Sequence, residues 1–349
     1  MRKNTRKIYI GNTPVGGGSP ITIQSMTNTK TYDVKATVQQ ILELEREGCD
    51  IVRVAVPDKR AASCLADIKK GISIPLVADI HFDYRLAIAA INAGADALRI
   101  NPGNIGSAER LARVVKAAAA RGIPIRIGIN GGSLEKDILE KYKTPCAEAL
   151  VESALRSIRL IEGMNYYNIK LSLKASDVLN TVQAYRLVSQ KVDYPLHVGV
   201  TEAGTFLSGT VKSSIGIGSL LMEGIGDTIR VSLTDRPVRE VEVGREILKS
   251  LGLYRKASID IISCPTCGRC GINLIELAER VADRVKDVKK PLKIAIMGCA
   301  VNGPGEAREA DIGIAGGSGK GIVFKKGKTI RTVREQDLLE ALMEEIDKY

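Results

Sequence analysis

The 349-residue sequence contains no tryptophan, three phenylalanines and two histidines. Because stacking platforms for single-stranded nucleic acids are built from aromatic side chains, this scarcity argues against a protein that binds RNA or single-stranded DNA. No apolar run is long enough to cross a bilayer, and the basic segment 1–7 has no apolar stretch behind it. Neither a membrane span nor a secretory signal is therefore expected, and the expected location is the cytoplasm.

The net charge of +11 permits either a nucleic-acid partner or a small anionic substrate, so the placement of the basic residues must decide. Hydrophobic residues make up 44% and charged residues 26% of the chain, as in an ordinary globular protein. The length is sufficient for a barrel-sized domain and a smaller second domain.

One unit recurs eight times: a short apolar run rich in β-formers, a polar turn, and a helix-like segment ending at Gly or Pro. Strands are predicted at 21–26, 51–56, 75–80, 97–101, 125–130, 169–174, 196–201 and 228–233. Helical spacing follows several of them, as at 37–47, 85–93, 108–121 and 179–190. Eight units in roughly 240 residues favour a closed, TIM-like (β/α)8 barrel of parallel strands over an open sheet. No Gly-x-Gly-x-x-Gly follows the first strand, which argues against a dinucleotide-binding fold.

Six of the eight predicted strands carry a basic residue at nearly the same position: Arg53, Arg99, Arg126, Lys170, His197 and Arg230. Side chains two residues apart share a face, so this face also carries Asn101, Asn130, Ser172, Lys174, Thr201 and Ser232. If it points inward, the buried cations require an anion or carboxylates such as Asp79 and Glu202 to balance them. Arginine offers planar bidentate donors, so the pattern predicts a phosphate or diphosphate site. Structural ion pairs at the barrel floor are the alternative for one or two of these cations.

The two histidines, His81 and His197, belong to the same polar set, which favours substrate contact over general acid–base catalysis. A helix at 238–251 is expected to close the barrel, giving a substrate-binding domain at 1–252 and a smaller α/β domain at 253–349. In the latter, strands are predicted at 259–262, 292–297, 312–315 and 322–324, and helices at 274–288 and 335–347. The glycine-rich stretch 316–321 fails the register of a phosphate-binding loop and predicts a hairpin turn.

Four cysteines of the second domain fall in two short stretches. Cys264, Cys267 and Cys270 follow one another at Cys-x-x-Cys spacing, and Cys299 precedes an Asn-Gly-Pro-Gly turn that ends at Glu306. A disulfide is disfavoured by the odd total of seven cysteines and the expected reducing compartment. A thioredoxin-like redox pair would use one Cys-x-x-Cys motif and would give Cys299 no role. An iron–sulfur cluster, which takes three or four soft ligands from separated loops, ranks ahead of a structural zinc site.

These motifs together resemble the bacterial 4-hydroxy-3-methylbut-2-en-1-yl diphosphate synthases of the non-mevalonate isoprenoid pathway. The resemblance rests on four stretches, 98–104, 196–204, 263–269 and 297–306, and covers essentially the whole chain in its two-domain form. It implies an oxidoreductase that reduces 2-C-methyl-D-erythritol 2,4-cyclodiphosphate by two electrons, with ring opening and loss of water. The electrons would come from flavodoxin or ferredoxin. It further implies a homodimer in which one chain's cluster domain caps the partner's barrel.

The resemblance also implies residue roles. A [4Fe–4S] cluster would be held by Cys264, Cys267, Cys299 and Glu306, whose oxygen is a weaker iron ligand than a fourth thiolate. Catalytic roles are expected for Glu306, Glu202 and His197. The residues expected to bind substrate are Arg53, Arg99, Arg126, Asn130, Lys174, His197 and Ser232. Lys170 is left out because the family motif centres on the second lysine.

Cys270 departs from the family pattern. Either Cys270 does not bind the cluster, or it replaces Glu306 and supplies a fourth thiolate ligand. The first alternative is favoured, because three cysteines in one short loop would be strained if they had to reach three corners of the cluster. Two alternatives of other classes stay open from the residues alone: a zinc-stabilised phosphate-binding barrel without a redox role, and an RNA-binding protein, which rests only on the net charge.

Overall fold

The computed structural model describes residues 2–299, 303–317 and 319–349. The chain forms two compact units, Met1–Tyr254 and Arg255–Tyr349, so that the division falls two residues beyond the boundary predicted at 252. Within the described part of the chain, no helix has both the length and the apolar character needed to cross a bilayer.

The first unit is built on eight parallel strands. They are β3 (Thr22–Met26), β4 (Ile51–Ala55), β5 (Leu76–Asp79), β6 (Ala97–Ile100), β7 (Ile125–Asn130), β8 (Ile169–Lys174), β9 (His197–Val198) and β10 (Thr228–Ile229). Their hydrogen-bonded order is β8-β7-β6-β5-β4-β3-β10-β9. An isolated parallel bridge between Leu171 and Leu196 brings β8 next to β9, so the sheet is a nearly closed barrel and the predicted fold class is confirmed.

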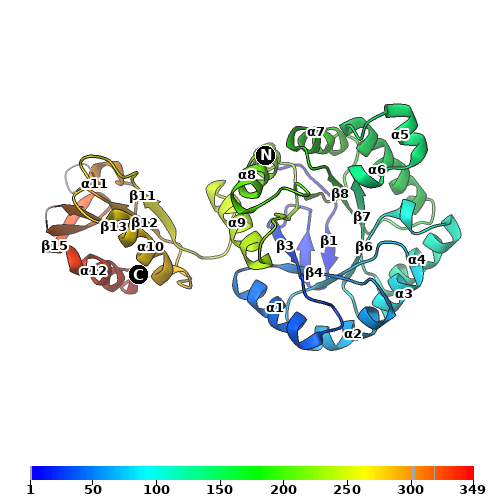
Figure 1. Ribbon diagram of the computed structural model, residues 1–349, viewed down its shortest axis with the longest axis horizontal. Coiled ribbons are helices and arrows are strands. Elements are labelled where there is room, and N and C mark those ends of the chain that lie inside the picture. Colours follow the sequence, from blue (N-terminus) through cyan, green and yellow to red (C-terminus); the bar gives the residue numbers. More distant parts are fainter. Residues whose placement is uncertain (1, 300–302, 318) are drawn as a thin grey trace. The chain divides into compact units, whose positions relative to one another are not determined.

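Helices surround this sheet (Figure 1). They are α1 (Val34–Arg46), α2 (Lys59–Lys70), α3 (Tyr84–Asn92), α4 (Ala108–Arg121), α5 (Lys136–Tyr142), α6 (Ala147–Glu162), α7 (Val178–Ser189), α8 (Phe206–Met222) and α9 (Pro237–Ser250). Sequence signals fix their ends: in α4, the Ser107 side chain accepts the N–H of Arg110, and Gly122 ends the helix with φ of 67°. Each amphipathic helix turns its apolar stripe onto the strands, which leaves the inward strand positions free for polar groups.

A short antiparallel hairpin, β1 (Ile8–Ile10) and β2 (Thr13–Val15), was not predicted from the sequence. Its buried apolar residues cluster with Ile51, Val77 and Ala97, which lie toward the amino ends of β4, β5 and β6. The hairpin therefore plugs the amino end of the barrel. A ligand must enter from the other end, where the strands meet the loops that lead into the helices.

The seam between β8 and β9 lacks a regular ladder and is held from outside by a tyrosine. The buried Tyr185 hydroxyl, from α7, accepts the Leu173 N–H at 3.0 Å and donates to the His197 carbonyl oxygen at 2.5 Å. Burial raises the pKa of this hydroxyl well above its usual value, so it remains a donor. The two strands that carry Lys174 and His197 are thereby held together.

The second unit is a five-stranded sheet in the order β11-β12-β13-β14-β15. Its elements are β11 (Asp260–Ser263), α10 (Leu274–Val285), β12 (Lys293–Met297), α11 (Gly303–Glu306), β13 (Ile312–Gly317), β14 (Lys320–Lys325), β15 (Lys328–Arg334) and α12 (Leu338–Asp347). The first three strands are parallel and the last two antiparallel. Gly317 pairs with Lys320, which confirms the predicted hairpin. The edge strand β15 was missed because its polar, largely exposed side chains give no buried face.

Candidate active site

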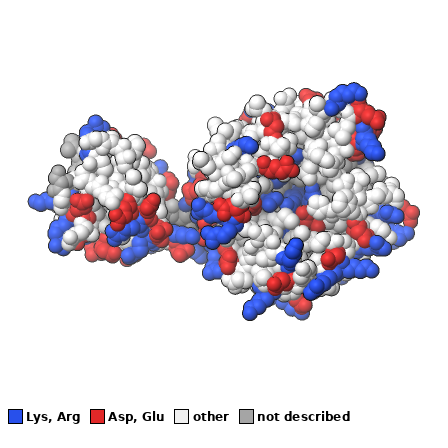
Figure 2. All heavy atoms as spheres, in the orientation of Figure 1, with Lys and Arg blue, Asp and Glu red and all other residues white. Residues whose placement is uncertain are grey.

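A single row of charged side chains crosses four neighbouring strands of the barrel. Asp79 pairs in register with Arg99, Arg99 with Arg126, and Arg126 with Lys170. All four are at most 6% exposed, and residues paired in register point to the same side of a sheet, so the row faces the interior. Figure 2 shows Lys and Arg atoms inside the hollow at the centre of the barrel.

Two glycines on the inner face make room for this lining. A Cβ on Gly128 would lie 2.6 Å from Arg99 Nε, and a Cβ on Gly199 would lie 2.2 Å from the Arg230 carbonyl oxygen and 3.0 Å from Lys174 Nζ. A side chain at 128 would displace the Arg99 guanidinium, and one at 199 would collide with the backbone at Arg230 as well as with the Lys174 amine. The two cations therefore cross over backbone rather than pack against side chains. The sequence held no signal for these close approaches beyond a glycine within a predicted strand.

Asp79 is the central counter-charge of the lining. Its carboxylate lies 3.1 Å from Arg99 Nη1, 3.6 Å from Arg53 Nε and 3.5 Å from Nε2 of the exposed His81. Burial by itself would raise the pKa of Asp79, but the Arg53 charge, the His81 hydrogen bond and the Arg99 charge hold the pKa well below its usual range. The carboxylate is therefore ionised at any physiological pH.

A second counter-charge was missed from the sequence. Glu240, in the first turn of α9, is buried and lies 3.5 Å from Arg230 Nη2, while its oxygens accept hydrogen bonds from Ser25 Oγ and the Leu233 N–H. Glu202, suggested from the sequence for this part, is exposed, has φ of 52° and makes no ion pair within the described residues. The suggestion was wrong because Glu202 lies in a left-handed turn after β9 rather than on the inner face.

Cations outnumber carboxylates in this interior. Arg53, Arg99, Arg126, Lys170 and Lys174 are buried, whereas three buried carboxylates act on the cations of this interior among the described residues: Asp79, Glu240 and Asp227, of which Asp227 acts on Lys170 and also pairs with Arg2. Among the described residues no carboxylate lies within ion-pair distance of Arg126, whose Nη1 donates to Gln24 Oε1 at 3.1 Å. Burial, together with the neighbouring arginine charges, lowers the pKa of Arg126 well below its ordinary value. The lining is therefore short of negative charge.

His197 lies within the cations and is fully buried. Its Nδ1 is 2.7 Å from Thr228 Oγ1, and its Nε2 has no hydrogen-bond partner among the described residues. Burial, and then the charges of Arg126 and Lys174, lower the pKa of His197 well below 6.5, so the ring is neutral at neutral pH. A neutral imidazole with one unused nitrogen offers a polar contact without adding to the positive charge.

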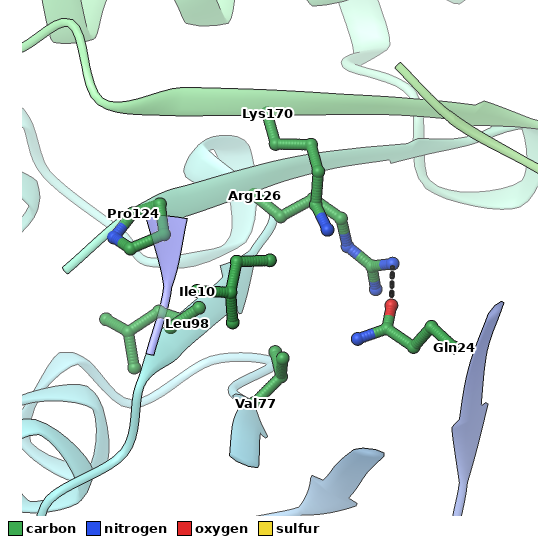
Figure 3. A pocket seen from close by; sticks show the side chains of 8 residues that line it. Ile10, Gln24, Val77, Leu98, Pro124, Arg126 and Lys170 are labelled. Atoms are coloured by element: carbon green, nitrogen blue, oxygen red, sulfur yellow. Dashed lines mark hydrogen bonds between the residues drawn. The ribbon is translucent and has the colours of Figure 1, made fainter. Parts of the chain in front are cut away.

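The two lysines of β8 lie at different depths. Lys170 is near the amino end, with a pocket beside it lined by Ile10 of the plugging hairpin, Gln24 and Arg126 among others. Figure 3 shows Lys170 and Arg126 on neighbouring strands, with the guanidinium turned toward Gln24. Lys174 ends the strand opposite Asn130, toward the open end. Burial lowers the pKa of both amines well below 10.5.

The remaining predicted substrate residues lie where the strands end. Asn130 is the last residue of β7 and is half-buried, and Ser232 follows β10 and is also half-buried. The structure thus brings the predicted polar set to the interior and the carboxyl end of one barrel, with Glu202 on an exposed turn at the same end.

In the second unit, the two cysteine stretches leave adjacent parallel strands at their carboxyl ends. Ser263 pairs with Ile296, so the stretch from Cys264 and the stretch that contains Cys299 begin side by side. The Gly298 N–H donates to Cys264 Sγ at 3.3 Å. The Gly303 N–H, at the start of the short helix α11, donates to the Cys299 carbonyl oxygen at 3.0 Å.

The thiols are chemically suited to an iron–sulfur cluster. No disulfide joins the cysteines of the described structure, and Cys264, Cys267, Cys270 and Cys299 supply the soft donors that iron–sulfur clusters take. A peptide N–H aimed at the sulfur of Cys264 is the kind of contact that tunes such clusters. The exposed carboxylate of Glu306 ends α11. Within the described residues no three donor side chains are already gathered around a metal-sized point.

Family models match both units of the chain. The GcpE TIM-barrel domain matches residues 5–245, and the GcpE protein C-terminal domain matches residues 260–348.

The chain belongs to the GcpE family.

Curated relatives in this family match nearly end to end. A protein of Caldanaerobacter subterraneus named 4-hydroxy-3-methylbut-2-en-1-yl diphosphate synthase (flavodoxin) is 63% identical over 100% of this chain and 98% of its own length. A protein of the same name from Clostridium acetobutylicum is 61% identical over 99% of each chain.

Solved structures that resemble this GcpE-family chain show the barrel fold alone. Dihydropteroate synthase of Yersinia pestis is 13% identical, with a TM-score of 0.51 over 70% of this chain and 98% of its own. 3-Dehydroquinate dehydratase of Geobacillus kaustophilus is 17% identical, with a TM-score of 0.51 over 73% of this chain and 99% of its own.

Proposed function

We propose that this chain is a 4-hydroxy-3-methylbut-2-en-1-yl diphosphate synthase. It reduces 2-C-methyl-D-erythritol 2,4-cyclodiphosphate by two electrons to (E)-4-hydroxy-3-methylbut-2-enyl diphosphate, opening the ring and releasing water. The observation that carries the proposal is the excess of buried cations, because a barrel interior with too little negative charge gains free energy when a diphosphate enters. The names of the relatives agree with this substrate class.

The basic residues bind and orient the diphosphate. Arg53, Arg99 and Arg126 supply guanidinium groups from three different strands, and Lys174 adds a point charge toward the open end. These groups are fixed before the substrate arrives, since Asp79 and Gln24 already hold two of the arginines in place. Binding energy is then available to hold the ring still while its C–O bond breaks.

His197 and the residues at the strand ends complete the substrate site. When Thr228 donates to Nδ1, the proton of the neutral ring is on Nε2, which donates to a substrate oxygen. Asn130 and Ser232 offer uncharged polar contacts at the carboxyl ends of their strands. Glu202, exposed beyond β9, is assigned a proton-handling role.

The proposed cofactor is a [4Fe–4S] cluster held by Cys264, Cys267, Cys299 and Glu306, and when bound it supplies single electrons at potentials that side chains cannot reach. The electron donor is flavodoxin, the donor in the relatives' names, or ferredoxin. The chain's own contribution is to supply the thiolates and the Gly298 N–H that contacts Cys264.

The test is reconstitution with iron and sulfide without oxygen, followed by an assay with reduced flavodoxin and the cyclic diphosphate. We expect a brown protein that forms the open-chain diphosphate. Cys264→Ala and Cys299→Ala are expected to lose iron and turnover, whereas Cys146→Ala, at the start of α6 in the barrel unit, keeps both. A colourless protein with stoichiometric zinc and no turnover contradicts the proposal.

We further propose that the protein is a homodimer. Leu207, Val211, Ile215 and Met222 are 49–77% exposed and follow one face of α8, a 17-residue helix in which Lys212 is the sole charged residue. Such an apolar stripe is costly in water unless another surface covers it. In the same proposal the cluster domain of one chain caps the barrel of the other, which brings the two half-sites together.

Charges placed on this stripe test the dimer. Leu207→Asp combined with Ile215→Asp is expected to give a monomer in sedimentation velocity at concentrations where the wild type is dimeric. Leu160→Asp, on α6, is a matched control because Leu160 is 39% exposed and lies outside the stripe. A double variant that sediments as a dimer shows that α8 is not the interface.

A further inference from the structure

Gly298 lies between two cysteines of the proposed cluster loop and is held on three sides. Its N–H donates to Cys264 Sγ at 3.3 Å, and its carbonyl oxygen accepts the Gly271 N–H at 2.9 Å. A Cβ on Gly298 would lie only 2.5 Å from Cys270 Sγ and 3.3 Å from Leu274 Cδ2. The thiol of Cys270 therefore occupies the space in which any side chain at 298 would have to lie.

Cys270 is itself fixed within its loop. Its N–H donates to the Cys267 carbonyl oxygen at 2.9 Å, and its thiol donates to the Ile272 carbonyl oxygen at 3.3 Å. Its side chain packs, half-buried, against the apolar core that includes Leu274 and Ile296. The thiol thus already has a hydrogen-bond acceptor and an apolar surrounding, as a packing cysteine does.

We propose that Cys270 is a positioning residue rather than a cluster ligand: its sulfur presses on Gly298 and keeps the Gly298 N–H on Cys264 Sγ. The proposal rests on the proposed function, because it assumes that Cys264 is a cluster ligand. Hydrogen bonds to the sulfurs of such a site stabilise its more negative, reduced state and so raise its potential. Cys270 would then influence how firmly the cluster is held and how easily it is reduced, without contacting it.

The experiment is a double-mutant cycle on the reconstituted full-length protein, comparing Gly298→Ala, Cys270→Ala and the combination. Three quantities are measured: iron per chain, the half-life of visible absorbance under an iron chelator, and the midpoint potential from a redox titration. Gly268→Ala is the matched control, since it lies in the same loop and a Cβ there meets no atom within 4 Å.

Gly298→Ala is expected to shorten the half-life at least tenfold and to lower the midpoint potential, because the new Cβ displaces Cys270 and disturbs the N–H contact with Cys264. Cys270→Ala is expected to keep full iron content and its visible spectrum, with a smaller loss of half-life. The combination is expected to recover most of the lost half-life, since removing the sulfur restores room at 298. Gly268→Ala is expected to match the wild type.

Two outcomes overturn this inference. If Cys270→Ala loses iron to the extent that Cys264→Ala does, Cys270 is a ligand. If the losses from Gly298→Ala and Cys270→Ala simply add, the two residues are not coupled. Failure of the wild type to take up iron or to turn over the cyclic diphosphate is a separate result, and it contradicts the proposed function instead.

Discussion

Asp79→Asn is expected to lower the free energy of unfolding of the barrel unit by about 3–5 kcal/mol, because it removes one partner of a buried ion-pair network. The Asp79 carboxylate is 3% exposed and lies within 3.6 Å of both Arg53 and Arg99. A neutral amide leaves these guanidinium groups facing Arg126 with less negative charge nearby. Urea unfolding followed by far-UV circular dichroism measures the loss, with the transitions of the two units fitted separately.

The pH dependence of this difference follows from the lowered pKa of Asp79. A carboxylate with a depressed pKa in the folded state stabilises the fold above its unfolded pKa of about 3.9, and this stabilisation is lost as the pH falls toward the folded value. The gap between wild type and Asp79→Asn should therefore be constant from pH 8 to about 5 and shrink below about pH 4.

Inorganic pyrophosphate is expected to restore part of the stability of Asp79→Asn, because a bound anion supplies the missing negative charge. Glu202→Gln is the matched control: its carboxylate is exposed, and its loss is expected to change the free energy of unfolding by less than about 0.5 kcal/mol. If Asp79→Asn is as stable as Glu202→Gln, the cationic row does not depend on Asp79.

Replacing the two lysines of β8 by methionine is expected to affect different properties: turnover at Lys174 and the free energy of unfolding at Lys170. Lys174→Met should lower turnover by about 10²–10³-fold, the usual loss when one preorganised charge at a reacting group is removed. Lys170→Met should keep most of the turnover and raise the free energy of unfolding at pH 7 by about 1–3 kcal/mol, because the Lys170 amine is buried without a hydrogen-bond partner in the described structure. Steady-state kinetics and urea unfolding separate the two effects.

The lowered pKa values of the lysines give the sign of the pH dependence. Between the folded pKa and the unfolded value of about 10.4, the unfolded state binds more protons, so the free energy of unfolding rises with pH. Each methionine variant should show a weaker rise over this window than the wild type. If both variants lose turnover equally, the diphosphate reaches the barrel floor and the difference in depth between the lysines has no functional meaning.

Much of the fold was predictable because its signals are local. The short apolar runs with a polar residue at every second position predicted the barrel strands, and helical spacing closed by Gly122 predicted α4 at its observed bounds. The same period of two placed Arg99 and Asn101 on one face, since side-chain direction in a strand follows from the backbone alone. The plugging hairpin β1–β2 was missed, because its three-residue strands are too short to show a period.

The sequence by itself determined which residue types face inward and that four thiols follow two strands of the second unit, since both properties are carried by spacing along the chain. Tertiary structure alone decided which carboxylates neutralise the cations, choosing Glu240 over Glu202, and which lysine of β8 lies against the floor. It also decided that Gly128, Gly199 and Gly298 lie against Arg99, Lys174 and Cys270. The physical reason is that these contacts depend on the register between strands distant in sequence, which the packing of the whole unit fixes.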